Sequence, residues 1–449
     1  MIRRFFSVAI FIASTISAQD PWAVVVPEIL ARIKPPQFPP RDFIITKYGA
    51  RDGADASAAI VKAIEACSRA GGGRVVVPKG DYLTGPIRLR SHIDLHLEAG
   101  ATLRFTQDPS RYPLAPTRFE GVELMNYSPL ISALDCEDIA ITGEGTLDGQ
   151  ADDQHWWNWK PPEGPQPQAV DRKELFKQNE DQVPVGQRLY GPGHYLRPTF
   201  VEPNRCKNVL IEGVTIRNSP FWALHPTLCS NVTIRHVTVI SRGPNNDGCD
   251  PESCRDVLIE DCVFKTGDDC IALKSGRNQD GRRINAPVDN VVIRGCRMSG
   301  GHGGITIGSE VSGGARNIFA EKNQLDSAEL ERGLRLKTNS ARGGFIENVF
   351  ARDIEIGTVK LAPIEIDLRY QDESGGFPPA VRNIIVDRMH SAKSQYGLYI
   401  RGEEKSPVRN VILRDCVFRG VADGHVIEGA VDMRLGVVVE MAPKKEIRK

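Results

Sequence analysis

Short segments in which aliphatic and polar residues alternate recur along most of the chain. Each segment begins with Asn or Asp and has an aliphatic residue at its second and fourth positions. Alternation with a period of two is typical of a strand with one buried face. An opening Asn or Asp suits the turn before a strand, where its side chain bonds nearby backbone. The segments begin at Asp138, Asn208, Asn231, Asp256, Asn290, Asn317, Asn348, Asn383 and Asn410.

The spacing of these segments predicts the fold. From Asn208 onward, successive starts lie 23, 25, 34, 27, 31, 35 and 27 residues apart. A leucine-rich repeat would show a Leu-dominated consensus, and a propeller would need four strands in a unit of roughly 40 residues. One set of strands per repeat, stacked on copies of itself, predicts an all-β chain that forms a single-stranded, right-handed parallel β-helix. We expect this domain to occupy residues 43–430.

The segments at either end of the repeats are predicted separately. A helix from about Ala56 to Cys67, begun by Asp55 and ended by Gly71 to Gly73, is expected to cap the first coil. Residues 19–42 are rich in Pro, which predicts an extended N-terminal arm. Residues 431–449 are predicted to form a C-terminal tail.

Residues 1–18 are predicted to be a secretory signal peptide. Arg3 and Arg4 precede an apolar run from Phe5 to Ala13, and small residues follow up to Ala18. The alternative is a buried N-terminal helix or strand. The run is too short to span a bilayer, and no later stretch reaches about 18 apolar residues. We therefore expect a secreted or periplasmic protein without a membrane segment.

Composition and charge limit the function classes. The chain has 449 residues, of which 41% are hydrophobic and 25% charged, and this excludes disordered and multi-span membrane classes. The 57 Lys and Arg residues balance 57 Asp and Glu residues, which argues against a nucleic-acid partner. Net charge says nothing about how charge is distributed, so a local basic patch for a polyanionic substrate is compatible with this balance.

Most of the ten Cys residues fall in columns of the repeat. Cys136, Cys206, Cys229 and Cys254 each stand two positions before a segment start, where later coils have Val, Ala or Ile. This exchange favours Cys as a small core residue, stacked from coil to coil. Disulfides between adjacent coils are the alternative in an exported protein. The Cys spacing shows no pattern of a structural metal site.

Three consecutive turns between coils carry an unusual set of polar residues. Their sequences are GPNNDGCDPESC, KTGDDCIALKSG and GGHGGITIGSE. Asp268 and His302 each lie twelve positions after their segment start, so we expect them to stack on adjacent coils about 4.8 Å apart. Asp247 and Asp269 are expected at the same level. Each motif alone is also compatible with an ordinary turn.

A candidate active site follows from the combination of these turns with the next coil. Arg335 and Lys337, in GLRLKT, are expected on one side of that coil's strand. Carboxylates that face a groove supply the acid and the base of glycoside hydrolysis, and crowding of like charges raises the pKa of one of them. Arg holds a carboxylate through two parallel hydrogen bonds, which suits an acidic sugar.

These motifs resemble those of glycoside hydrolase family 28, the polygalacturonases. NNDGCD, GDDC, GGHGGITIGS and RLKT occur in the order of the N-T-D, G-D-D, G-H-G and R-I-K blocks of that family. The resemblance covers nearly all of residues 43–420. Asn246 stands where the family commonly has Thr, a change that leaves the neighbouring carboxylate intact.

The resemblance implies hydrolysis of α-1,4-linked galacturonic acid in pectin, with inversion and without a metal or another cofactor. It implies Asp268 as general acid, Asp247 and Asp269 as bases that position water, and His302 as support for the acid. Inversion rests on the resemblance alone. Adjacent coils are about 4.8 Å apart, short of the roughly 6.5–9.5 Å typical of inverting carboxylate pairs.

Further residues are implied in substrate binding. Arg335 and Lys337 would bind the substrate carboxylate, and Tyr370 in DLRYQD loosely matches a substrate-contacting Tyr of the family. The loop KSGRNQDGRR resembles the exo-acting bacterial branch, and its cations would recognise the chain terminus; otherwise it is a solvated loop. Residues 151–200 hold a Trp cluster that either walls the groove or packs locally. The loop cations are Arg277, Arg282 and Arg283, and the cluster is Trp156, Trp157 and Trp159.

Competing functions use different chemistry. A β-helix lyase would also bind pectin but normally needs calcium, and NNDGCDPE lacks the spacing of a calcium loop. A non-catalytic carbohydrate-binding β-helix would not need the acidic stack. A hydrolase acting on rhamnogalacturonan or decorated pectin is a closer alternative. The expected partners are pectin oligosaccharides, with no nucleic acid, and we expect a monomer.

Overall fold

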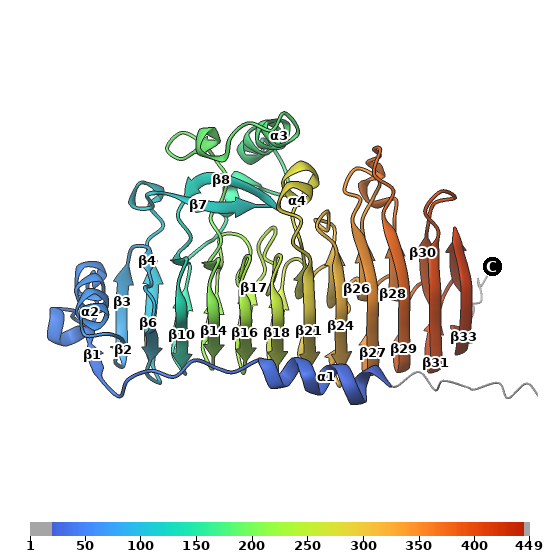
Figure 1. Cartoon of the computed structure of the whole chain (residues 1–449), viewed down its shortest axis with the longest axis horizontal. Helices are drawn as coiled ribbons and strands as arrows, with labels where there is room; N and C mark the ends of the chain where they lie inside the picture. Colours follow the sequence, from blue (N-terminus) through green and yellow to red (C-terminus); the bar gives the residue numbers. More distant parts are fainter. Residues whose placement is uncertain (1–19, 444–449) are drawn as a thin grey trace, which may run out of the picture.

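Strands from successive coils lie side by side along one axis in the computed structural model, which describes residues 20–443 (Figure 1). All pairings between neighbouring coils are parallel; for example, Val209 pairs with Val232, which pairs with Val257. The predicted right-handed parallel β-helix is confirmed, and the Asn-led segments are its longest row of strands. In chain order this row is β1 (Asp42–Ile44), β2 (Gly73–Val77), β5 (Ile93–Leu97), β10 (Glu137–Gly143), β14 (Lys207–Glu212), β16 (Ser230–Arg235), β18 (Arg255–Glu260), β21 (Val288–Arg294), β24 (Ala315–Glu321), β27 (Phe345–Thr358), β29 (Ala380–Lys393), β31 (Val408–Val421) and β33 (Ala430–Met441).

Two further rows complete each coil. The second row is β3 (Gly80–Thr84), β6 (Ala101–Phe105), β11 (Thr146–Asp148), β15 (Thr215–Arg217), β17 (Thr238–Ser241), β19 (Val263–Thr266), β22 (Arg297–Ser299) and β25 (Gln324–Leu325), and the last of these pairs with β27. The third row is β4 (Ile87–Arg88), β9 (Ile131–Leu134), β13 (Val201–Asn204), β20 (Ile271–Leu273), β23 (Ile305–Gly308), β26 (Arg332–Lys337), β28 (Ala362–Asp367), β30 (Leu398–Arg401) and β32 (His425–Glu428).

Helices and a small sheet decorate this core. A hairpin of β7 (Leu114–Phe119) and β8 (Val122–Tyr127) pairs with β12 (Leu189–Tyr190). It lies beside α3 (Pro167–Glu180) and α4 (Asn278–Ile284) on one side of the β-helix (Figure 1). The other helices are α1 (Pro21–Arg32), α2 (Ser57–Arg69), η1 (Ile45–Tyr48), η2 (Pro109–Arg111), η3 (Trp157–Trp159), η4 (Val185–Gln187) and η5 (Tyr370–Asp372).

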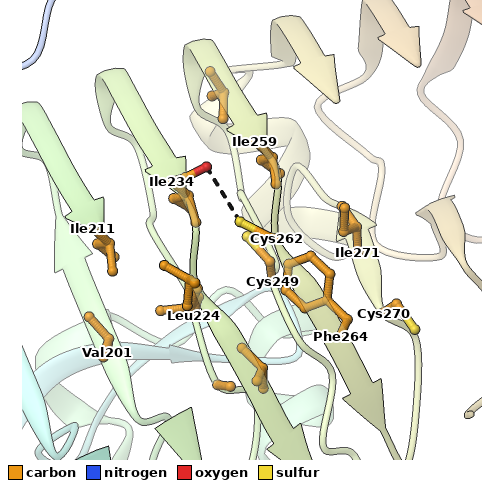
Figure 2. Close-up of a cluster of buried hydrophobic side chains, with 14 of the residues drawn as sticks. Val201, Ile211, Leu224, Ile234, Cys249, Ile259, Cys262, Phe264, Cys270 and Ile271 are labelled. Carbon is orange, nitrogen blue, oxygen red and sulfur yellow. Dashed lines mark hydrogen bonds between the residues drawn. The ribbon is translucent and has the colours of Figure 1, made fainter. Parts of the chain in front are cut away.

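The interior is built from stacked identical side chains. Ile211, Ile234 and Ile259 pair in register on adjacent coils and face the core, as Figure 2 shows. The Sγ of Cys262 lies 3.6 Å from the carbonyl oxygen of Ile234, to which it donates. All ten Cys residues lie within the described part of the chain and none forms a disulfide. The prediction that Cys packs as a core residue is confirmed.

The Asn residues that open the coils form a hydrogen-bonded ladder. Asn317 has φ of 57° and donates from Nδ2 to Oδ1 of Asn290, 3.1 Å away; Asn348 repeats this to Asn317 at 3.2 Å. Bonds to nearby backbone were the expectation, and these side-chain partners on the next coil correct it. Asn tolerates the left-handed conformation better than most residues, so each coil can turn there.

The predicted capping helix is present as α2, at the first coil (Figure 1). Asp55 accepts hydrogen bonds from the backbone N–H and the hydroxyl of Ser57, each through Oδ1. The inner face of α2 is buried against the first coils, as expected for a cap that covers an open strand edge. The buried side chains of this face are Ala59, Ile60, Ala63, Ile64 and Cys67.

The prediction of an extended arm over 19–42 is wrong for its first part, because residues 21–32 form α1. Asp20 accepts from the N–H of Trp22, and Pro21 at the first turn suits a helix start. Trp22, Val26 and Ile29 share one buried face that packs on the outer side of β18, β21, β24 and β27. The apolar spacing of the helix, rather than its Pro content, decides this segment.

Two other predicted segments remain: the C-terminal tail differs in the structure, and the signal peptide is not among the described residues. The predicted C-terminal tail begins with a strand, since β33 covers Ala430–Met441 and pairs with β31 in parallel. The predicted signal peptide lies outside the described residues. Within residues 20–443, no helix has both the length and the apolar character to cross a membrane.

Candidate active site

The predicted chemical residues meet where the third row of strands begins. Cys249 pairs with Ile271, and Ile271 pairs with Ile305, so Asp247 and Asp269 occupy equivalent positions on adjacent coils. Asp247 and the neighbouring Asp268 line a pocket of about 340 Å³. Residues of α3 and of the turn between β7 and β8 also line it, and these elements lie on the side of the β-helix that carries the insertions (Figure 1).

Three carboxylates form the centre of this pocket. Asp247, Asp268 and Asp269 each place an oxygen within 4.8 Å of the others. The Asp268 side chain is 15% exposed, whereas Asp247 and Asp269 lie behind it and are almost fully buried. The predicted stacking of the acidic residues is therefore confirmed. Inversion stays a prediction from the family resemblance, since the 4.8 Å applies to the nearest oxygens and not to the separation of whole carboxyl groups.

Asp269 is held as a carboxylate by two cations. Lys337 Nζ lies 2.7 Å from Oδ2 of Asp269, and Arg335 Nη1 lies 3.3 Å from Oδ1. Burial raises the pKa of Asp269. The charges of Lys337 and Arg335 outweigh this effect and bring the pKa well below its usual range. The aromatic ring of Tyr370 lies 5.1 Å from Lys337 Nζ, measured to the ring centroid. The structure thus brings these three predicted binding residues together; Lys337 and Tyr370 line the pocket, and Arg335 lies behind them.

Asp268 forms an ion pair with His302 across adjacent coils. His302 Nδ1 lies 2.9 Å from Oδ1 of Asp268. The hydrogen bond and charge of Asp268 raise the pKa of His302. Burial raises the pKa of Asp268, and the hydrogen bond and charge of His302 outweigh this and lower it. Below the raised pKa of His302, the pair therefore carries one proton on the imidazole, beside the most exposed carboxylate of the stack.

Asp247 has a buried acidic neighbour that sequence reasoning missed. Asp250 is fully buried and neither of its oxygens has a hydrogen-bond partner in the described chain. Lys274 Nζ lies 3.6 Å from Asp250 and 3.9 Å from Asp247. Burial raises the pKa of Asp247 well above its usual value, and the charges of Asp250 and Asp268 raise it further. Asp250 stands in the quoted motif NNDGCD, but the pattern alone does not reveal that it points inward.

The basic loop does not line the pocket as predicted. Arg277 is buried and stacks on Phe176, with its guanidinium carbon 3.8 Å from the ring centroid. Arg282 donates to the backbone carbonyls of Ala341 and Arg342. Arg283 pairs with Glu123 and Asp280. These three cations fasten α4 to its neighbours and do not line the pocket, so the structure lends their predicted role in substrate binding no support.

The Trp cluster packs locally. Trp156 is 2% exposed and makes edge contacts with Tyr112 and Trp159. Trp157 donates from Nε1 to the carbonyl of Ser219 at 2.9 Å. The sugar-stacking alternative for these residues is not supported, since none of the three lines the pocket. Their packing instead fixes the chain just before Lys160, which does line it.

Sequence reasoning did not single out several residues that line the pocket. Trp222 lies beside the acids and stacks under Lys274, whose Nζ is 4.4 Å from the ring centroid. Asn245, Lys274 and Glu310 stand in the three quoted turns, where the pattern does not reveal that they face the pocket, and the others lie farther from the acids in sequence. Only the folded chain brings them together. The missed lining residues are Glu120, Lys160, Gln168, Arg172, Trp222, Asn245, Lys274 and Glu310.

Ammonium groups lie beside the acids at the centre of the pocket. The three carboxylates are the acidic residues that could together hold a cation in the described chain. Lys337 and Lys274 already place ammonium groups 2.7 Å from Asp269 and 3.9 Å from Asp247. A divalent ion would be repelled by both. A larger pocket of about 680 Å³ beneath α2 contains a single carboxylate, that of Glu65, and so lacks a pair of carboxylates.

Comparison with known proteins adds a family assignment. The family model described as "Glycosyl hydrolases family 28" matches residues 193–429. The chain is similar to a solved hyperthermoactive exopolygalacturonase from Thermotoga maritima, with 46% identity and a TM-score of 0.89 over 93% of this chain and 95% of that one.

Two curated relatives are similar over part of their length. A probable polygalacturonase from Vitis vinifera is 33% identical over 65% of this chain and 55% of its own length. An exo-poly-alpha-D-galacturonosidase from Dickeya chrysanthemi is 28% identical over 75% of this chain and 58% of its own length. The chain thus spans little more than half of these two relatives.

Proposed function

Because the chain belongs to glycosyl hydrolases family 28, we propose that it hydrolyses α-1,4-glycosidic bonds between galacturonic acid units of polygalacturonate or pectin. One observation carries this proposal: three carboxylates have oxygens within 4.8 Å of one another, and two of them, Asp247 and Asp268, line a pocket that also holds Lys337 and His302. An acid, a base and cations for an acidic sugar are the groups that this reaction needs.

Each predicted residue receives a role that its surroundings support. Asp268 is the general acid: it is the most exposed of the three acids and passes to the leaving oxygen the proton that the Asp268–His302 pair holds. Asp269 stays ionised and, with Asp247, positions the attacking water. Arg335 and Lys337, which both lie over the ring face of Tyr370, hold the substrate carboxylate. No metal is proposed to take part.

Action at the chain end is part of the proposal. Glu120 of the β7–β8 turn and Gln168, Ala169 and Arg172 of α3 line the pocket, and a wall built from these insertions stops a polymer from passing through. The similarity to a Thermotoga maritima exopolygalacturonase supports the same mode. We also carry forward export from the cell, which rests on the basic and apolar N-terminus, and a monomeric state.

One assay separates hydrolysis from the competing activities. The protein is incubated with polygalacturonate in the presence of a chelator, and both reducing ends and ultraviolet absorbance of unsaturated product are followed. Reducing ends without unsaturated product are expected. Unsaturated product would indicate a lyase, and neither signal would indicate a binding protein. Release of a single small product throughout the reaction is expected for exo action, whereas mixed oligomers would overturn that part.

The acidic limb of the pH profile is expected to depend on Asp250. Asp250→Asn removes a negative charge beside Asp247, so the pKa of Asp247 falls and the acidic limb of kcat/KM moves to lower pH. The basic limb, which follows the proton shared with His302, is expected to lie above the usual His pKa and to move little. The profile of Asp153→Asn, a change at an exposed acid of the insertion, serves as control. An unchanged or upward-shifted acidic limb would contradict this coupling.

A further inference from the structure

The cations that line the pocket differ in whether a carboxylate compensates them. Lys337 pairs with Asp269 at 2.7 Å, and Lys274 lies 3.3 Å from Glu310. Arg172 forms hydrogen bonds with both carboxylate oxygens of Glu120. Within residues 20–443, Lys160 has no carboxylate oxygen within 4.0 Å of its Nζ. It is therefore the lining cation whose charge the described chain leaves uncompensated.

Lys160 shares its one hydrogen-bond acceptor with a second cation. Its Nζ lies 2.7 Å from Oδ1 of Asn245, and the same oxygen accepts from Nη2 of Arg197 at 2.9 Å. Arg197 is buried and its other acceptors are also uncharged: the side chain of Gln168 and the carbonyls of Pro220 and Pro244. Two positive charges thus converge on a neutral amide oxygen.

Such an arrangement is unfavourable without an anion. Burial removes water from a charge, and neutral acceptors return only part of the lost solvation. Burial accordingly lowers the pKa of Lys160, and it lowers the pKa of Arg197 to about 9. The charges of Glu120 and Asp268 raise the pKa of Lys160, but neither carboxylate forms an ion pair with it. A carboxylate that entered the pocket would complete the charge balance.

The position of Lys160 relates it to the acids. Asn245 lies two residues before Asp247 on the coil that precedes Asp268, whereas Lys337 lies on the second coil after it. Lys160 and Lys337 therefore flank the acids from opposite directions along the axis of the β-helix. Adjacent coils are about 4.8 Å apart, so the two cations are spaced for different units of a chain laid along that axis.

Lys160 is also held in a fixed place. It follows η3 directly, and its N–H donates to the carbonyl of Trp157 at 2.9 Å. The side chain of Trp157 in turn donates a hydrogen bond to the carbonyl of Ser219, and the neighbouring Trp156 is buried. A pre-positioned charge loses little conformational freedom when it binds a ligand. The packing of the Trp cluster therefore holds the ammonium group of Lys160 in place at the pocket.

We propose that Lys160 binds the carboxylate of a second uronic acid unit, on the opposite side of Asp268 from Lys337, and so determines specificity for two adjacent unesterified units. Arg197 acts through Asn245 as a positioning residue. The inference rests on the proposed function, because it assigns a further contact for the same substrate. It implies that a methyl ester on the unit at Lys160 is discriminated against.

The test compares Lys160→Met with Lys173→Met, a change at an exposed Lys of α3. With trigalacturonate as substrate, Lys160→Met is expected to raise KM about 10–100-fold, the typical effect of losing one hydrogen bond to a charged group, with a smaller change in kcat. Lys160→Arg is expected to restore part of the loss. Lys173→Met is expected to leave both constants unchanged. An unchanged KM in Lys160→Met overturns the inference.

A binding experiment excludes a merely structural effect. In the Asp268→Asn background, the affinity of trigalacturonate and of its fully methyl-esterified form is measured with Lys or Met at position 160. The loss caused by Met is expected for the acid form and not for the ester. An equal loss for both forms would overturn the inference. If the wild-type chain cleaves no polygalacturonate, the proposed function fails; if it does and these losses are absent, this inference alone fails.

Discussion

Asp268→Asn is expected to abolish measurable turnover of polygalacturonate while leaving the fold intact. The amide has no proton to give to the leaving oxygen, and general acid catalysis typically contributes about 10²–10⁴ in rate. Its oxygen can still accept from His302 and from the N–H of Asp269, which lie 2.9 Å from Oδ1 in the wild-type chain. Release of reducing ends under single-turnover conditions measures the loss.

The control for this prediction separates chemistry from folding. Asp153 is exposed and lies in the insertion that covers residues 151–200. Asp153→Asn is expected to retain full activity. Both variants are expected to unfold at the temperature of the wild type and to bind trigalacturonate. If Asp268→Asn kept more than about a tenth of the wild-type rate, the loss would be smaller than the removal of a general acid causes. Asp268 would then not be the acid.

The stacked part of the site could be predicted because the repeat fixes register. Asp268 and His302 share an offset from their coil starts, and the structure places them 2.9 Å apart. Lys337 and Arg335 alternate on one strand, and both reach Asp269. In a solenoid, each coil contacts mainly its neighbours, so sequence offset translates directly into distance.

The remainder of the site depends on insertions that have no such register. Arg277 and Arg282 looked available because their loop is polar, but the folded chain surrounds them with Phe176 and Phe377. Lys160 lies far from the acids in sequence, and no motif marks it. Segments outside the repeat take their position from tertiary packing, which local pattern does not encode.

The same reason explains the error at the N-terminus. Pro27 inside α1 argues against a helix, because it removes a backbone donor. Trp22, Val26 and Ile29 nevertheless follow helical spacing, and they meet an apolar strip formed by outward-facing side chains of the strands. The strip comprises Leu258, Val292, Phe319 and Phe350. It could not be recognised from the alternating pattern, which assigns those positions to the solvent face.

A buried ionic network beneath the pocket predicts the largest effect on stability. Glu252 accepts from Arg118 at 2.7 Å and lies 2.9 Å from Nε2 of His225; on the other side, Nδ1 of His225 lies 3.3 Å from Glu202. All four side chains are essentially inaccessible to solvent. The ring of His225 packs edge-on against Trp222, 4.8 Å between centroids, and so supports the pocket wall.

Glu252→Ala is expected to destabilise the fold by about 3–5 kcal/mol, because it leaves Arg118 and His225 buried without their shared counter-ion. Unfolding followed by circular dichroism under matched heating rates would measure this. Glu137→Ala is the matched control, since Glu137 also faces a His, with His92 3.7 Å away, but on the surface. Its effect is expected to stay within about 0.5 kcal/mol. A similar effect of the two variants would contradict a buried charge network.

The network also gives wild-type stability a definite pH dependence. Burial lowers the pKa of His225, but the hydrogen bonds and charges of Glu202 and Glu252 raise it more, to about 8. A group whose pKa is raised on folding stabilises the protein below its unfolded value, near 6.5, and this contribution is lost as pH rises through about 8. The difference corresponds to about 2 kcal/mol. Glu252→Gln is expected to flatten this decline, because the neutral amide keeps the shape of the site but no longer favours the protonated ring. A decline of the same size in both proteins would place its origin elsewhere.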